Sequence, residues 1–207
     1  MPRLTSVAND AKNWDHRYRS EPHSDPEPAP FLRQVLPLCP RGRALDLAMG
    51  AGRNAVYLAS RGWRVTGLDS SRVALEKAAG LARDHQVSVH WTRDLSREFS
   101  RKLPGLLLLE ANLELWSLPA EQFDLIVCFN FLQRSLFASI ERALRHRGML
   151  VYETFTVEQL GFPDGPHNPD YLLHSGELRQ SFGELQTLFY CELRTGKGIA
   201  GLLARKP

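Results

Sequence analysis

The segment Ala44–Asn54, with the sequence Ala-Leu-Asp-Leu-Ala-Met-Gly-Ala-Gly-Arg-Asn, most constrains how this chain can fold. A short apolar run leads to an acid, Asp46, and is followed by a loop of small residues and then by a helical pattern. A second apolar run, 63–68, ends in another acid, Asp69. This order predicts two neighbouring parallel strands joined by a helix. A ligand is expected to lie across the ends of both strands, over the glycines.

The rest of the chain repeats this alternation and predicts an α/β fold. We expect a Rossmann-like, mostly parallel, seven-stranded sheet with helices on both faces. Only Thr195-Gly196-Lys197 separates the last two apolar runs, so the chain should end in an antiparallel hairpin. The expected strands are 43–47, 63–68, 106–110, 123–128, 149–154, 187–194 and 198–205. Helices are expected from Arg53, from Ser70 or Ser71, over 136–148 and from Ser175.

Two segments compete for the third strand of this sheet. One is 87–91 and the other is 106–110, and both are apolar enough to be strands. We favour 106–110, because a short loop then leads to the strand at 123–128. The segment 87–91 would then be an additional strand or hairpin.

Length, charge and cysteine content exclude several classes of protein. At 207 residues the chain can form one domain, with 1–42 as an N-terminal cap segment and 43–207 as the Rossmann-like domain. The net charge of +3 is mild, so no nucleic-acid partner is expected. No apolar run reaches the roughly 18 to 20 residues that span a bilayer, so we expect a cytoplasmic protein without a membrane partner. The three cysteines are far apart, which predicts neither a disulfide framework nor a metal site.

The two acids indicate which cofactor the strand ends would bind. Gly50–Ala55 fits the pattern G-x-G-x-x-A, which also fits nicotinamide dinucleotide domains. Asp46 disfavours a dinucleotide, because an acid four residues before the first glycine would repel its pyrophosphate. S-adenosylmethionine has no phosphate, and its ammonium and sulfonium groups would be attracted to Asp46. Asp69 can accept from both ribose hydroxyls. The alternatives are a loop-bracing carboxylate for Asp46 and a helix N-cap for Asp69.

These residues also carry a family resemblance. Its parts are Asp46–Asn54, Tyr57-Leu58-Ala59, Gly62, Val65, Asp69, Asn112-Leu113-Glu114, Leu118-Pro119, Phe123–Val127 and Tyr152–Phe155. Together they resemble the class I methyltransferases that use S-adenosylmethionine, and most of all the tellurite-resistance-type branch. The resemblance covers 43–205. It implies an enzyme that transfers a methyl group to a small-molecule acceptor, with S-adenosylmethionine as cofactor and S-adenosylhomocysteine as product.

The resemblance assigns cofactor contacts to residues of this chain. Gly50 and Gly52 would lie under the cofactor, and Asp69 would bind its ribose. Asn112 stands where the family usually has an acid beside adenine, and Asp94 would take that place if 87–91 were the third strand. The full implied set is Asp46, Ala48, Gly50, Gly52, Asn54, Asp69, Ser70, Asn112, Leu113 and Asn130.

Catalytic residues are harder to predict than cofactor contacts. Methyl transfer is an in-line displacement, and holding the nucleophile in line can supply much of the rate without a strong base. The polar candidates are Tyr18, Asn130, Arg134, Glu153, Thr154, His167 and His174. Two other functions stay open. One is an NAD-dependent oxidoreductase, which Asp46 disfavours. The other is a non-catalytic cofactor-binding or regulatory protein, which is compatible with Asn112 in place of the family's usual acid. The sequence predicts no oligomeric state.

Overall fold

The computed structural model describes residues 4–20, 25–93, 105–113 and 116–207, with the side chains of 4–11 left out. The chain divides into two compact units. The first consists of Met1–Ala29 with Arg41–Ser117, and the second of Pro30–Pro40 with Leu118–Pro207. The described residues form a mixed α/β fold with eight strands.

The first unit contains four parallel strands in the spatial order β3-β4-β2-β1. Their bounds are β1 Arg43–Leu47, β2 Arg64–Asp69, β3 Val89–Thr92 and β4 Leu106–Glu110. The register pairs Asp46 with Gly67 across β1 and β2, and Asp69 with Glu110 across β2 and β4. The carboxyl ends of β1, β2 and β4 therefore meet at one edge of this sheet.

The second unit contains the other four strands in the order β5-β6-β8-β7. Their bounds are β5 Phe123–Phe129, β6 Leu144–Phe155, β7 Gln186–Leu193 and β8 Ile199–Arg205. β5 and β6 are parallel, whereas β8 runs antiparallel to both β6 and β7. The expected C-terminal hairpin is thus confirmed.

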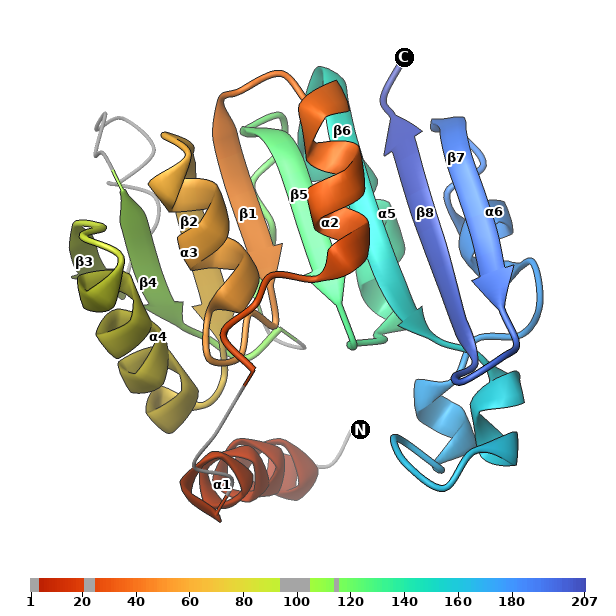
Figure 1. The fold of residues 1–207 in the computed structure, drawn as a ribbon, viewed down its shortest axis with the longest axis horizontal. Coiled ribbons are helices and arrows are strands. Elements are labelled where there is room, and N and C mark those ends of the chain that lie inside the picture. Colours follow the sequence, from red (N-terminus) through yellow and green to blue (C-terminus); the bar gives the residue numbers. More distant parts are fainter. Residues whose placement is uncertain (1–3, 21–24, 94–104, 114–115) are drawn as a thin grey trace. The chain divides into compact units, whose positions relative to one another are not determined.

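Helices cover the sheets of both units. In the first unit α3 and α4 lie side by side against the strands, and α1 lies against α4 (Figure 1). In the second unit α2 lies on one face, while α5 and α6 lie on the other (Figure 1). The α-helices are α1 Leu4–Ser20, α2 Pro30–Val35, α3 Arg53–Ser60, α4 Arg72–Asp84, α5 Phe137–Ala143 and α6 Glu177–Ser181. Short 3-10 helices span η1 Leu36–Leu38, η3 Arg134–Leu136, η4 Val157–Gly161 and η5 Pro169–Tyr171. No helix among the described residues has the length and apolar character needed to cross a membrane.

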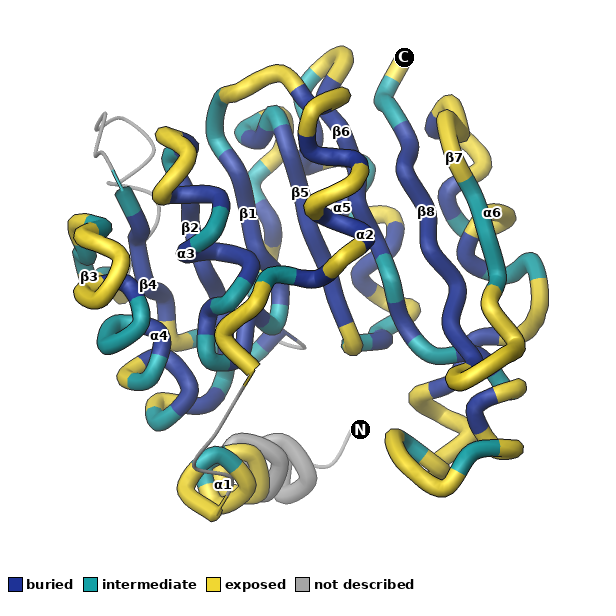
Figure 2. Tube along the Cα trace, viewed as in Figure 1, coloured by how far each residue is buried: buried dark blue, intermediate teal, exposed yellow. Residues whose placement is uncertain are grey.

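The strands form the core of each unit. β1, β2, β5 and β8 are buried along almost their whole length (Figure 2). Strands that are buried on both faces have nearly continuous apolar sequence, which explains why these segments lack a clear alternation of polar and apolar residues. Against this background, Asp46 and Asp69 are two of the few buried charged residues.

The expected third strand is present, whereas one expected helix is shorter than predicted. The preferred third strand, 106–110, is confirmed as β4, because it pairs with β2. The competing segment also forms a strand, β3, at the edge beside β4, so the fold has eight strands rather than seven. The helix expected over 136–148 is wrong in its second half. α5 ends at Ala143 because Leu144 already pairs with Phe123 in the sheet.

Candidate functional site

The loop between β1 and α3 turns sharply because three of its residues have positive φ. Ala48, Gly50 and Gly52 have φ of 52°, 57° and 86°. A Cβ on Gly52 would lie 2.6 Å from the Cβ of Ala78 on α4, so only glycine lets the loop approach that helix. Ala48 adopts the left-handed conformation with a side chain, which carries a conformational cost. The loop therefore exposes backbone, rather than side chains, next to the ends of β1 and β2.

Asp69 braces this loop from the end of β2. Its side chain is 8% exposed. One oxygen accepts from the N–H of Gly50 at 2.8 Å, and the other accepts from the N–H of Ser71 at 2.9 Å. Burial raises the pKa of Asp69, and these amide bonds oppose that rise. Ser70 and Ser71 were both predicted as possible N-caps of α4. The cap is Ser71, whose hydroxyl accepts from the N–H of Ala74, so Asp69 is not itself the cap.

Asp46 is the most deeply buried acid of the site, with 1% of its surface exposed. Its Oδ2 atom is buried and has no hydrogen-bond partner among the residues that the structure describes. Burial and the neighbouring charge of Asp69 raise the pKa of Asp46 to about 8, while Arg53 and the N–H of Ala55 lower it. A buried carboxylate oxygen without a partner is costly to the fold. The arrangement is explained if a cationic or hydrogen-bond-donating ligand completes it.

The end of β4 adds Asn112 and Leu113 to the same edge. The N–H of Ala111 donates to the backbone oxygen of Asp69 at 3.0 Å, which fixes the chain leaving β4 beside β2. Leu113 is buried, and Asn112 is partly exposed. The alternative residue, Asp94, lies outside the described residues. Since β4 rather than β3 neighbours β2, the condition that favoured Asp94 is not met.

Three further predicted residues of the first unit surround the loop. The oxygen of Asn54 accepts from the N–H of Ala29 at 2.9 Å, so this buried amide ties α3 to the N-terminal segment. Ser70 is half-buried, and its backbone N–H helps to lower the pKa of the Asp69 carboxyl. Tyr18 comes from α1, and its hydroxyl lies directly over Gly50, 2.5 Å from where a Cβ would be. The role of Tyr18 as a catalytic candidate stays a prediction.

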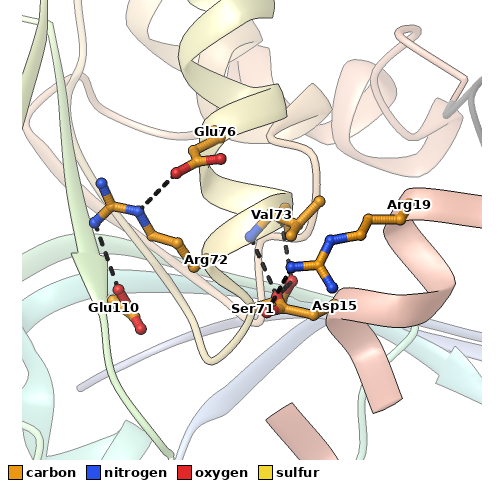
Figure 3. Close-up of polar contacts among 8 residues, drawn as sticks. Asp15, Arg19, Ser71, Arg72, Val73, Glu76 and Glu110 are labelled. Atoms are coloured by element: carbon orange, nitrogen blue, oxygen red, sulfur yellow. Dashed lines mark hydrogen bonds and ion pairs between the residues drawn. The ribbon is translucent and has the colours of Figure 1, made fainter. Parts of the chain in front are cut away.

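The structure also brings in Asp15, which the sequence did not identify as a site residue. It accepts from the hydroxyl of Ser71 at 2.6 Å and from the N–H of Val73 at 3.2 Å (Figure 3). The available signal was its spacing from Tyr18, since residues three apart share a helix face.

Asn130 and Glu153 lie together in the second unit. Asn130 follows β5 with φ of 55°, and its N–H donates to the backbone oxygen of Glu153 at 2.9 Å. Both residues thus mark the carboxyl ends of the parallel strands β5 and β6. Thr154, next to Glu153, is buried.

Arg134 is occupied by structural contacts within the second unit. Its guanidinium forms a two-bond pair with Glu177, at 2.5 Å and 3.0 Å. It also donates to the backbone oxygens of Asp170 and Leu172, at 3.1 Å and 2.9 Å. The side chain therefore fixes the loop that leads into α6.

The two histidine candidates also sit within loops. The ring nitrogens of His167 lie 3.1 Å and 3.0 Å from the backbone oxygens of Gly165 and Phe162. The backbone N–H of His174 donates to Glu177 at 2.8 Å. Both histidines therefore have local bracing contacts.

The comparison with known families decides the assignment of this fold. Residues 45–152 match the model of the methyltransferase domain family, which is more than half of the chain. The chain belongs to this family. The matched range contains the glycine loop, both buried acids and the end of β4. The resemblance inferred from the motifs is therefore confirmed at the level of the family and of the Rossmann-like fold.

Individual relatives are more distant. An uncharacterised protein of Schizosaccharomyces pombe is 25% identical over 87% of this chain and 63% of its own length. The ribosomal RNA small subunit methyltransferase B of Thermus thermophilus is 38% identical, but over 38% of this chain and 20% of its own length. The chain thus spans less than two thirds of these two relatives. Among solved structures, TehB from Haemophilus influenzae aligns with a TM-score of 0.61 at 19% identity, covering 86% of this chain and 61% of that one.

Proposed function

We propose that this chain is an S-adenosylmethionine-dependent methyltransferase that acts on a small-molecule acceptor. The observation that carries the proposal is the pair of buried acids, Asp46 and Asp69, at neighbouring strand ends on either side of the glycine loop. The membership in the methyltransferase domain family supports it. Bound S-adenosylmethionine would supply a methyl group activated by its positively charged sulfur.

The residues of the site fit a ligand of this kind. The unpartnered Oδ2 of Asp46 can hold the positively charged methionine part. Asp69 offers about four lone-pair directions, of which two backbone amides use two, so it can also accept from ribose hydroxyls. A nicotinamide dinucleotide fits less well, because its pyrophosphate would lie beside two buried acids.

We assign the cofactor contacts along the sheet edge in the order in which the strands present them. Asp46 and the backbone around Gly50 and Gly52 would hold the methionine part. Asp69 would hold the ribose, with Ser70 beside it. Asn112 and Leu113 would contact the adenine. Asn54 and Ala48 would act indirectly by shaping the loop, and Asn130 stays a proposed contact.

For the acceptor we propose Asn130 and Glu153 as orienting groups. The backbone bond between them holds both at the carboxyl ends of β5 and β6. Neither is required to act as a strong base, because orientation alone can supply much of the rate. Arg134 and His167 are weaker candidates, since their polar atoms already contact their own unit.

The proposal of a small acceptor is supported by the charge of the described surface. Several exposed arginines are paired with acids, as in Arg72 with Glu76 and Arg145 with Asp124. A net charge of +3 and such paired arginines do not form the bare basic surface by which proteins bind nucleic acids.

The cofactor proposal is tested by calorimetric titration of the full chain with S-adenosylhomocysteine and, separately, with NADH. We expect binding of S-adenosylhomocysteine and none of NADH. The opposite preference would establish the oxidoreductase alternative. Binding of S-adenosylhomocysteine by a protein that transfers no methyl group to any fraction in the next experiment would favour a non-catalytic role.

The acceptor is tested with S-adenosylmethionine labelled on its methyl group. Low-molecular-weight metabolites and total RNA from the same cell extract serve as separate acceptors. We expect label in the metabolite fraction, and less in the same fraction when the variant Asp69→Asn is used. Label in RNA alone would replace the small acceptor with a nucleic acid.

A further inference from the structure

The described side chains of the N-terminal helix α1 are those of residues 12–20, and few of them pack against the rest of the first unit. Among residues 12–20, only Asp15 and Tyr18 are half-buried, and all the others are exposed. These two residues are three positions apart, so they share one face of the helix. A helical segment with so little buried surface can separate from its support at a low cost in free energy. The docking of this part of α1 therefore depends on two contacts.

The first contact joins α1 to the start of α4. Asp15 accepts from the hydroxyl of Ser71 at 2.6 Å and from the N–H of Val73 at 3.2 Å (Figure 3). The N–H of Val73 belongs to the first turn of α4, where backbone donors have no partner within the helix. A carboxylate is favoured at that end by the helix dipole. Arg19, 3.7 Å from the other oxygen of Asp15, also belongs to α1, so this ion pair joins α1 to no other element.

The second contact joins α1 to the glycine loop. The hydroxyl of Tyr18 lies over Gly50, where even a methyl group would meet it at 2.5 Å. The N–H of Gly50 in turn donates to Asp69. Asp15 also acts on Asp69 directly, because its negative charge helps to raise the pKa of that carboxyl. Both contacts of α1 thus reach the residues to which the proposed function assigns the cofactor.

We propose that α1 is a detachable lid over the glycine loop, and that Asp15 is its latch, a positioning residue that slows the release of the cofactor and its product. This inference rests on the proposed function. Asp15 does not touch the ligand in this scheme. It holds Tyr18 on the loop, and the closed helix then restricts the path by which a bound nucleoside leaves.

The test compares three variants of the full chain by stopped-flow release of S-adenosylhomocysteine. Asp15→Ala removes the latch, and Asp15→Asn keeps an acceptor oxygen but no charge. Glu76→Gln is the matched control, since it makes the same acid-to-amide change on α4 at an exposed pair with Arg72. We expect the dissociation rate to rise about tenfold in Asp15→Ala, as for the loss of one charge-assisted contact, and less in Asp15→Asn. The control should release the ligand at the wild-type rate.

Hydrogen exchange separates a latch from a merely structural residue. In the wild type, S-adenosylhomocysteine should slow exchange in the peptide that contains 4–20, and Asp15→Ala should abolish this protection while the strands stay protected. Should Asp15→Ala fail to fold, Tyr18→Ala removes the other contact and should give the same two results. Wild-type release rates and intact protection of α1 in these variants would overturn the inference. If the wild type binds no S-adenosylhomocysteine at all, the proposed function fails, and the inference fails with it.

Discussion

Asp69 accepts a hydrogen bond from the N–H of Gly50 at 2.8 Å, and this bond joins the end of β2 to the loop that follows β1. The second oxygen of the same carboxylate accepts from the N–H of Ser71, at the start of α4. One buried side chain therefore fixes both the loop and the neighbouring helix. The same side chain keeps lone pairs free for a ligand.

Replacing Asp69 with Asn should weaken both the fold and ligand binding. An amide has one acceptor oxygen, so it cannot accept from Gly50 and Ser71 through separate atoms as the carboxylate does. We expect the free energy of unfolding to fall by about 1–3 kcal/mol and the affinity for S-adenosylhomocysteine to fall at least about tenfold. Urea unfolding and calorimetry measure the two effects. The exposed Asp84→Asn is the control, and wild-type affinity in Asp69→Asn would rule out the assigned ribose contact.

The stability of the protein should depend on pH through Asp46. Its pKa is about 8 in the folded state, against 3.8 as the ordinary value. The folded state therefore holds a proton that the unfolded state has lost between these values. The stabilising contribution is complete below about pH 4 and is lost as the pH rises toward about 8, by at most about 1.4 kcal/mol per pH unit.

The variant Asp46→Asn isolates this contribution. Relative to the wild type, it should gain stability as the pH of urea unfolding is raised from about 5 to about 8, because the amide cannot ionise. The same variant should bind S-adenosylhomocysteine more weakly, since an amide cannot ionise to pair with the ammonium group of the ligand. A stability difference that does not change with pH would contradict the raised pKa of Asp46.

Replacing Ala48 with Gly should stabilise the loop. Ala48 has φ of 52°, a conformation that glycine adopts without steric cost. We expect the free energy of unfolding to rise by about 0.5–1 kcal/mol, since relief of strain exceeds the added entropy of the unfolded chain. The matched change Ala59→Gly, inside helix α3, should act in the opposite direction. Thermal unfolding of both variants decides the point, and a lower midpoint for Ala48→Gly would show that the loop is not strained there.

Replacing Arg134 with Lys should loosen the loop before α6. Lysine cannot reproduce the paired bonds to Glu177 together with the bond to the backbone of Asp170. We expect a loss of about 1 kcal/mol in stability, because the pair is partly exposed, and faster proteolysis within 158–174. Arg134 holds the pKa of Glu177 below its usual value. The pair therefore stabilises the fold near neutral pH, and this stabilisation is lost as the pH falls through the lowered pKa of Glu177. Arg142→Lys is the control, and equal proteolysis of wild type and Arg134→Lys would leave Arg134 available for another role.

The strand ends that carry Asp46 and Asp69 could be predicted, because the patterns that indicate them lie within short stretches of sequence. β1 has the bounds expected from the apolar run that contains Asp46, and β2 spans Arg64–Asp69, one residue from the expected 63–68 at each end. Small residues in a short loop after a buried strand leave few alternatives to a tight turn into a helix. The position of the two acids therefore followed from the order of residues alone.

Contacts between distant segments could not be predicted in the same way. Arg134 was a catalytic candidate, yet its side-chain partner, Glu177, is 43 residues away in the chain. The helix α1 spans Leu4–Ser20, and its Asp15 reaches Ser71 across 56 residues. Leu144 fits a helical periodicity, but its pairing with Phe123 places it in a strand. In each case tertiary packing outweighs the local pattern.

We infer that Asp46 and Asp69 hold opposite parts of one nucleoside, with its ammonium-bearing methionine part beside Asp46 and its ribose beside Asp69. A crystal structure of the wild-type protein grown with S-adenosylhomocysteine tests it most directly. We predict the ribose hydroxyls within hydrogen-bond distance of Asp69, and the methionine part over Gly50 and Gly52 beside Asp46. A ligand bound away from both acids, or no bound ligand at a saturating concentration, would contradict the claim.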